Sequence, residues 1–390
     1  MGIFELSLRA SETTKHGLII VPTDALGGAE SNLMKVATEL KRRRWNLCII
    51  FLSRGDNGKW DQFDVSEKHY VASNRELYGF IKSVLWLAKK RLSGQRFDLS
   101  FTSHVHTNAF VGLCTLLGCL AVKRRVYRES SKPFDRYTGL RIFAFKLMYR
   151  LYRAPDLLVL QTQDMKEQLM KRVPFTRARR LKVIPNPVEY ESLLKRSKQS
   201  ADVKYPLHEN QNTVELVSVG RLVDAKAFDV LLYAFKQLLD SSTHQRYRLN
   251  IVGKGPNYDS LVCIAEELGI SNKVCFHGHI ANPLPLMREA DLCVVSSRVE
   301  GFPNALLEMM TVSKAVVSTT CADGVSSLPG ISVCDTESAK QLSNAMVQEL
   351  SVCSSERRKK IILMRKHVKT RTVEGFVNSL LETTDEAINY

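Results

Sequence analysis

Residues 297–308 read SRVEGFPNALLE and are the most informative stretch of this chain. An apolar run, DLCVVSS at residues 291–297, precedes the turn and predicts a buried strand. A helical pattern then runs from Asn304 to Val312, so the Gly-Phe-Pro-Asn turn places backbone amides at the start of a helix, where they can bind an anion. Glu300 and Glu308 flank this turn. A ligand with phosphates and several hydroxyls, such as a nucleotide sugar, suits this combination.

The two glutamates, spaced around GFPNALL, resemble the E-x7-E motif of retaining glycosyltransferases of the GT-B fold, in particular family 4. The resemblance implies an α/β chain with two doubly wound, Rossmann-like domains that face each other across a cleft. It also implies that Glu300 faces the transferred sugar and that Glu308 accepts hydrogen bonds from the ribose hydroxyls. The amides of the turn would bind sugar hydroxyls or phosphate, through Gly301, Phe302, Pro303 and Asn304.

A second segment, GRLVDAKAF at residues 220–228, follows a predicted strand and resembles the G-R-L…K-G-F/A-F segment of the same family. The resemblance implies that Arg221 and Lys226 hold the donor diphosphate and stabilise it as it leaves. A guanidinium and an ammonium in one cleft can neutralise a diphosphate without a metal. No D-x-D pair stands where a metal-bound diphosphate would need one, so we expect no metal and no cofactor. Two solvated cations on a surface loop are the alternative interpretation.

Glycine-rich turns after other predicted strands supply further candidates. TDALGGAE at residues 23–30 resembles the family's N-terminal loop over the donor phosphates, and VCFHG at residues 274–278 resembles its base-binding segment. Glycine allows the backbone to approach a ligand closely, although a Gly-Gly pair often marks only a turn. The remaining expected donor-binding residues are Gly27, Gly28, Gly220, Gly253, Gly255, His277 and Gly278.

Two histidines follow the strand predicted at residues 97–103. Family 4 enzymes carry a histidine beneath the transferred sugar at the end of this strand, and His104 is the better match, with His106 second. A neutral imidazole can bind sugar hydroxyls or move a proton near pH 7, although many histidines are structural. We therefore expect His104 to join Glu300, Arg221 and Lys226 as catalytic residues. His106 and Arg128 are candidate contacts to the acceptor.

The predicted elements suggest a division of the chain. Residues 1–195 form an acceptor-side N-terminal domain, whose last strand is expected at residues 183–188, and residues 207–370 form the domain that binds the nucleotide sugar. The polar segment at residues 196–206 is the expected linker. Residues 371–390 are expected to form a helix that crosses back to the N-terminal domain, as GT-B chains do.

The charge is distributed unevenly. The chain has 390 residues and a net charge of +16; its first 190 residues hold 33 basic and 17 acidic side chains, and the remainder holds 23 of each. The basic half predicts an anionic partner, whether a lipid surface, a phosphate-bearing acceptor or nucleic acid. Helices predicted at residues 75–94 and 139–153 are amphipathic and basic, which suits an anionic membrane or packing against a sheet with a solvated stripe.

Compartment is indicated by what the sequence lacks. Its longest apolar run is too short to span a bilayer, and the first 15 residues do not resemble a signal peptide. The nine cysteines include no C-x-x-C pair and are read as reduced. We therefore expect a cytoplasmic protein, peripheral on the inner face of the plasma membrane.

Together these features predict a retaining, metal-independent hexosyltransferase. The expected donor is a nucleotide-diphosphate sugar, with UDP as the expected nucleotide and a hexose or N-acetylhexosamine as the sugar. The expected acceptor is a lipid-linked or surface glycan in polysaccharide or lipopolysaccharide synthesis at the anionic inner leaflet, with no nucleic acid as partner. One alternative is a GT-B UDP-sugar 2-epimerase, which needs no acceptor. Another is a non-catalytic polyanion binder, which would need aromatic residues interleaved with its cations.

Overall fold

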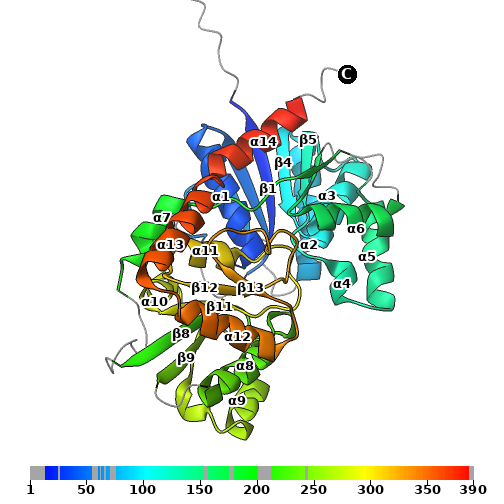
Figure 1. Cartoon of the computed structure of the whole chain (residues 1–390). Coiled ribbons are helices and arrows are strands. Elements are labelled where there is room, and N and C mark those ends of the chain that lie inside the picture. The colour runs from blue at the N-terminus through cyan, green and yellow to red at the C-terminus, as the bar shows by residue number, and fades with distance from the viewer. Residues whose placement is uncertain are drawn as a thin grey trace, which may run out of the picture. The chain divides into compact units, whose positions relative to one another are not determined.

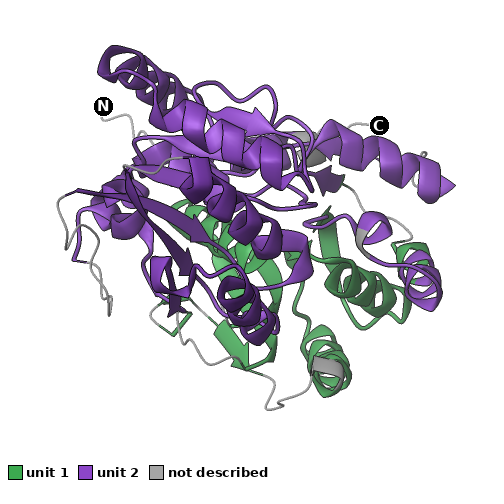
Figure 2. Cartoon of the chain, turned by 60° about the horizontal axis from the view of Figure 1, so that its bottom comes forward, with its two compact units in different colours: residues 1–128, 148–157, 383–390 green, residues 129–147, 158–382 purple. Residues whose placement is uncertain are grey.

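A computed structural model of the chain describes residues 14–24, 27–54, 60–61, 63–65, 67–70, 76–152, 157–174, 180–200, 212–241 and 245–385. The chain divides into two compact units (Figure 2). Unit 1 comprises residues 1–128, 148–157 and 383–390, and unit 2 comprises residues 129–147 and 158–382. Most of the predicted linker, residues 201–206, lies outside the described residues, and the predicted domain boundaries stay predictions.

Unit 1 contains five strands of a parallel sheet, in the order β3-β2-β1-β4-β5. In register, Ile19 of β1 pairs with Ile49 of β2 on one side and with Phe101 of β4 on the other. β1, β2 and β4 are buried at nearly every position because helices cover both faces of a parallel sheet. The strands are β1 (His16–Thr23), β2 (Asn46–Ser53), β3 (Glu67–Tyr70), β4 (Phe97–Ser103) and β5 (Val122–Arg128). The helices of this unit that pack on them are α1 (Gly28–Arg42), α2 (Glu76–Leu92) and α3 (Val105–Leu116).

The segment that follows β5 carries shorter elements. They are α4 (Pro133–Arg136), α5 (Leu140–Arg150), β6 (Leu157–Leu160), α6 (Gln163–Arg172), β7 (Leu181–Val183) and α7 (Tyr190–Ser197). β6 and β7 are parallel neighbours. The strand predicted at residues 183–188 was wrong in its position, because β7 ends at Val183. Pro185 and Pro187 have no N–H to donate, so the ladder cannot continue through them.

Unit 2 contains a six-stranded parallel sheet of order β10-β9-β8-β11-β12-β13 (Figure 1). Its strands are β8 (Thr213–Val219), β9 (Arg246–Val252), β10 (Val274–Gly278), β11 (Leu292–Val295), β12 (Val316–Thr319) and β13 (Ser332–Cys334). The helices are α8 (Phe228–Ser241), α9 (Tyr258–Glu267), α10 (Leu284–Glu289), α11 (Asn304–Val312), α12 (Ala339–Leu350), α13 (Ser354–Lys369) and α14 (Val373–Asp385). The predicted α/β fold with two doubly wound, Rossmann-like parts is therefore confirmed.

Alternation along the strands of unit 2 fills two cores. Leu216 joins a cluster with α8 and α12 on one face, and Val217 joins a cluster with α10, α11 and α13 on the other. Successive strand residues point to opposite faces, so one apolar strand supplies both cores. The C-terminal segment begins against the end of β7, since Val188 N donates to Arg371 O at 2.7 Å and Lys182 Nζ donates to Ser379 O at 3.4 Å. Whether residues 371–390 reach the N-terminal domain stays a prediction.

Both sheets have a point at which the strand order reverses. In unit 1 it lies between β1 and β4, and in unit 2 between β8 and β11. The loops that leave two such neighbouring strands run in opposite directions, so ligands of open α/β sheets bind at their carboxyl ends. The sequence-predicted candidates Gly27, Gly28 and His104 follow β1 and β4, and the predicted Arg221, Lys226 and Glu300 follow β8 and β11.

Candidate active site

The loops that follow β8 and β11 are joined by an ion pair. Nζ of Lys226 lies 2.5 Å from Oε1 of Glu300, and Ser297 Oγ donates to the same carboxylate at 3.0 Å. The Glu300 residue is only 9% exposed. Two residues selected from separate motifs of the sequence therefore meet in one partly buried site within unit 2.

Backbone contacts hold these loops together around the ion pair. Ser296 Oγ donates to Lys226 O at 2.9 Å, and Arg298 N donates to Ala225 O at 2.8 Å. Arg298 also donates from Nη1 to Asp224 O at 2.6 Å and pairs with Asp229 and Glu337. The hydrogen bond to Asp229 raises the pKa of the Arg298 guanidinium. Arg298 thus fixes the position of the Lys226 loop relative to the Glu300 loop.

The turn that carries Lys226 has an unusual backbone. A short 3₁₀ segment, Asp224–Lys226, ends at Ala227, which is left-handed with φ of 51°. L-residues other than glycine adopt this conformation at a cost, so the surrounding hydrogen bonds must hold it. The side chain of Lys226 runs over Gly220, where a Cβ would lie 3.4 Å from Lys226 Cδ.

Glycines allow three turns of unit 2, at Gly220, Gly253–Gly255 and Gly278, to interlock. Gly253 has φ of 152°, and a Cβ there would lie 1.8 Å from Gly220 O. Gly253 N donates to Gly278 O at 2.7 Å, and a Cβ on Gly255 would lie 2.2 Å from Leu222 O. Any side chain at Gly253 or Gly255 would therefore displace the Arg221 loop. The packing of the turns thus requires glycine at both positions, whether or not they also contact the donor as predicted.

Contacts from other segments of unit 2 hold the Gly-Phe-Pro-Asn turn in place. Asn186 Nδ2 donates to Asn304 Oδ1 at 2.7 Å, and the Arg371 guanidinium lies 4.9 Å from the centre of the Phe302 ring. A Cβ on Gly301 would lie 2.8 Å from Ser130 O. Pro303 is the N-cap of α11 and provides no side-chain hydrogen bond to the first turn. Glu308 lies one turn further along α11 and is partly exposed.

In unit 1 the predicted histidine occupies a strained position. His104 connects β4 to α3 with φ of 84°, a conformation that few residues with a side chain adopt outside functional or tightly packed sites. Its Nδ1 lies 2.7 Å from Ser103 O, and its Nε2 lies 3.7 Å from Oε1 of Glu30 on α1. Gly27 and Gly28 begin α1 with an extended N-cap, so the two predicted segments of unit 1 meet at Glu30 and His104.

The two candidate acceptor contacts are placed differently. His106 stacks on His104, with ring centres 5.4 Å apart, and meets the edge of Phe80. Arg128 is 1% exposed and its Nη1 donates to Ser103 Oγ at 3.3 Å, so the side chain is packed beneath the end of β4. Neither role toward an acceptor is tested by this geometry. Among the described residues, no three His, Cys, Asp or Glu side chains form a group that could hold a metal.

Two protein-family models match this chain in succession. Residues 26–192 match Glycosyltransferase Family 4, and residues 200–361 match Glycosyl transferases group 1. The chain belongs to the GT-B glycosyltransferases. The predicted family is thereby confirmed.

Relatives of this GT-B glycosyltransferase are distant. It is 26% identical over 188 residues to an uncharacterized glycosyltransferase of Methanocaldococcus jannaschii, with 48% of this chain and 45% of the relative covered. It is also 26% identical over 184 residues to N-acetylgalactosamine-N,N'-diacetylbacillosaminyl-diphospho-undecaprenol 4-alpha-N-acetylgalactosaminyltransferase of Campylobacter jejuni, with 47% of each covered. A lipopolysaccharide 1,6-galactosyltransferase of Salmonella typhimurium is 26% identical over 169 residues, with 42% of each covered. The chain spans about half the length of the curated relatives it matches.

Solved structures support the fold. HepE of Anabaena, in complex with UDP and glucose, aligns with a TM-score of 0.76 and 17% identity over 95% of this chain and 100% of that one. OtsA in its apo form aligns with a TM-score of 0.75 and 14% identity over 95% of this chain and 99% of that one.

Sequence reasoning missed Arg298 and Ala227 in this GT-B glycosyltransferase. Arg298 is the cation of the SRVEG stretch, two residues before Glu300, and its position beside an acidic loop was the available signal. Ala227 stands where the family pattern has glycine, and that departure was the signal for a left-handed residue.

Proposed function

We propose that this GT-B glycosyltransferase transfers a hexose or N-acetylhexosamine from a UDP-sugar to a glycan acceptor, with retention and without a metal. The observation that carries the proposal is the ion pair of Lys226 with Glu300 at the strand-order reversal of unit 2. It brings a cation for phosphate and a carboxylate for sugar hydroxyls to one site. The HepE structures contain UDP with glucose in one case and UDP-glucose in another, which supports the same donor class for this chain.

In this proposal the donor diphosphate competes for Lys226. The flexible ammonium moves from Glu300 to the phosphate oxygens, where Arg221 joins it, and Glu300 is released to accept hydrogen bonds from the sugar. Once they contact the diphosphate, these two cations stabilise the negative charge that develops on it in the transition state. The acceptor attacks the face that the leaving group occupies, and the departing phosphate assists its deprotonation. Glu308 accepts from the ribose hydroxyls, and His104 lies beneath the sugar.

The acceptor we propose is a lipid-linked or surface glycan at an anionic membrane. The Campylobacter relative is named for a diphospho-undecaprenol acceptor, and two other relatives are named for lipopolysaccharide synthesis. A pyrophosphate-linked glycan and an anionic leaflet would both attract the basic first half of the chain.

The surface of α5 supports membrane contact. Leu140, Phe143 and Leu147 are 88%, 68% and 53% exposed, and their spacing places them on one stripe of the helix. Arg141 and Lys146 are exposed on the same helix. Large apolar side chains next to cations are the pattern of a helix that lies in a bilayer interface. No helix in the described part of the chain is long and apolar enough to cross a membrane.

Helix α2 repeats this pattern in unit 1. Tyr78, Ile81 and Leu85 are exposed at the spacing of one helical stripe, and Lys82 and Lys89 are exposed beside them. We therefore propose α2, taken within unit 1 by itself, as a second helix that contacts an anionic leaflet.

The donor assignment is tested by melting the wild-type protein with a panel of nucleotide-diphosphate sugars. A UDP-sugar that binds is expected to raise the melting temperature, since a ligand at 100 times its Kd adds about 2.7 kcal/mol to the free energy of unfolding. Transfer to undecaprenyl-pyrophosphoryl glycans is then measured with and without EDTA, and the anomeric configuration of the product is read by proton NMR. Inversion would contradict the retaining mechanism, and sugar conversion without any acceptor would indicate the epimerase.

A further inference from the structure

A chain of polar side chains runs through the sheet of unit 2, beneath the glycine turns. Glu215 on β8 and Asn250 on β9 are both 0% exposed, and the chain ends at His277 on β10. Glu215 pairs in register with Arg248, so the carboxylate and the guanidinium lie side by side on neighbouring strands. Ionisable and amide groups are rarely placed in such a core unless their hydrogen bonds are made.

The Glu215 carboxylate is surrounded by donors. Arg248 Nη2 donates to Oε1 at 2.6 Å, Arg248 Nε lies 3.0 Å from each oxygen, and Asn250 Nδ2 donates to Oε2 at 2.8 Å. A buried carboxylate that accepts several charge-assisted bonds is held in one orientation. The amide of Asn250 is held as well, because Nδ2 also donates to Leu216 O at 3.2 Å.

This arrangement determines the tautomer of His277. Since Nδ2 of Asn250 faces Glu215, its Oδ1 faces the imidazole, and His277 Nε2 lies 2.9 Å from that oxygen. An amide oxygen can only accept, so Nε2 carries the proton. Burial lowers the pKa of His277, and Arg248 lowers it further while Glu215 acts in the opposite direction. The ring is therefore a neutral donor at pH 7.

The imidazole lies directly before the turns expected to receive the nucleotide. Gly278 follows His277 with φ of 68°, and its carbonyl accepts from Gly253 N, which itself packs on Gly220. A Cβ on Gly278 would lie 3.8 Å from Lys254 Cε, so the side chain of Lys254 approaches the backbone at Gly278. Fixing the ring therefore fixes the end of β10 and the turns that lean on it.

We propose that Glu215, Arg248 and Asn250 are positioning residues of the donor site, which hold His277 as an Nε2-protonated imidazole and so set the glycine turns for the nucleotide. This inference rests on the proposed function, because it assigns the turns to the nucleoside diphosphate. A purely structural ion pair would affect stability alone, whereas this network also controls affinity.

The test uses full-length variants and nucleoside diphosphates as probes. Asn250→Leu and His277→Leu remove the hydrogen bond, and His277→Gln retains a side-chain N–H that can reach Asn250. Glu349→Gln is the matched control, because Glu349 is 1% exposed in the same unit and pairs with Lys360 and Ser332 away from β10. UDP, GDP and ADP are titrated by calorimetry, and the imidazole nitrogens of His277 are followed by ¹⁵N NMR without ligand.

We expect Asn250→Leu and His277→Leu to weaken binding of the preferred diphosphate about tenfold or more, with His277→Gln recovering part of that loss and Glu349→Gln within about threefold of wild type. The NMR signal should show Nε2–H in the wild type and a tautomer mixture in Asn250→Leu. Equal affinities of Asn250→Leu and Glu349→Gln would overturn the inference, as would an Nδ1–H signal in the wild type. A wild-type protein that binds none of the diphosphates but shows Nε2–H would instead overturn the donor assignment.

Discussion

Lys226 Nζ lies 2.5 Å from Glu300 Oε1, so the cation proposed to meet the diphosphate is held by the carboxylate proposed to meet the sugar. This pairing keeps both groups ordered before substrate arrives. It also means that removing either partner leaves the other as a charge without its neighbour in a partly buried site.

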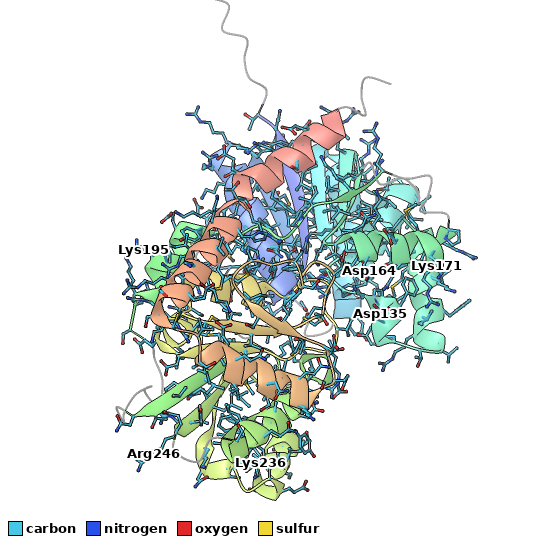
Figure 3. The ribbon with its side chains drawn as sticks, viewed as in Figure 1. Asp135, Asp164, Lys171, Lys195, Lys236 and Arg246 are labelled. Carbon is cyan, nitrogen blue, oxygen red and sulfur yellow. The ribbon has the colours of Figure 1, made fainter. Side chains whose placement is uncertain are left out.

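Replacing Lys226 should therefore impair transfer. We expect Lys226→Ala to lower kcat by about 10²–10³-fold, the usual loss when one group that stabilises transition-state charge is removed. Lys226→Arg should recover part of that loss, since it keeps the charge but not the reach. Lys236→Ala is the control, because Lys236 lies on α8 (Figure 3) and pairs with Asp240 one turn further along that helix. Steady-state kinetics in which the two alanine variants behaved alike would refute the assignment.

Replacing Ala227 with glycine should stabilise the protein. The left-handed conformation costs an L-residue about 1–2 kcal/mol, and glycine avoids this cost. Part of the gain is lost because glycine has more conformational freedom in the unfolded chain. We expect Ala227→Gly to raise the free energy of unfolding by roughly 0.5 kcal/mol. Ala234→Gly, inside α8, should lower it by about 1 kcal/mol. Urea denaturation compares them, and a loss of stability in both would show that Ala227 is unstrained.

The exposed stripe of α5 should bind anionic lipid. We expect Leu140→Ser, Phe143→Ser and Leu147→Ser together to reduce sedimentation with phosphatidylglycerol vesicles by about tenfold, because three apolar side chains no longer enter the interface. Wild-type binding should fall as salt rises. The control, Ile362→Ser with Leu363→Ser, removes exposed apolar side chains of α13. Equal losses in both, or equal binding to neutral vesicles, would contradict the proposed attachment.

Cysteine reactivity should separate into two groups. Burial raises the pKa of Cys293 and Cys321 to about 12, so these thiols stay protonated and unreactive near neutral pH. The hydrogen bond with Ser355 lowers the pKa of the exposed Cys353, so more of it is thiolate at pH 7. We expect iodoacetamide to label Cys353 first, and Ser355→Ala to slow that labelling at pH 7 but not well above the thiol pKa. Mass spectrometry of timed digests measures both, and early labelling of Cys321 would contradict its burial.

Much of the fold was predictable because apolar runs in a parallel sheet are continuous and easily seen. The candidate residues lie in loops that follow strands. Several of these loops leave the sheets at the points where the strand order reverses, so the motifs and the topology indicate the same places. β3 was missed because EKHY is a short, polar strand at an edge and has no apolar pattern. The strand near residues 183–188 was displaced because its apolar residues continue past the prolines that end the ladder.

The contacts that position the site were harder to predict. Glu215 lies inside the apolar run TVELVSV, and nothing in that run shows that Arg248 stands beside it on the next strand. Arg298 holds a loop that lies far away in the sequence. Such pairings depend on strand register and on the order of strands in the sheet, neither of which a pattern along one chain contains.

The strand-order reversal between β8 and β11 also places the proposed phosphate contacts and the proposed sugar contacts on separate loops, which can evolve independently. The loop after β8 leaves the sheet in one direction with Arg221 and Lys226, and the loop after β11 leaves in the other with residues 297–304. In the proposed function, substitutions in the second loop would alter which sugar is accepted while the residues proposed to bind the phosphates stay unchanged. Such a scaffold would change its glycan product without changing the residues proposed to bind the nucleotide.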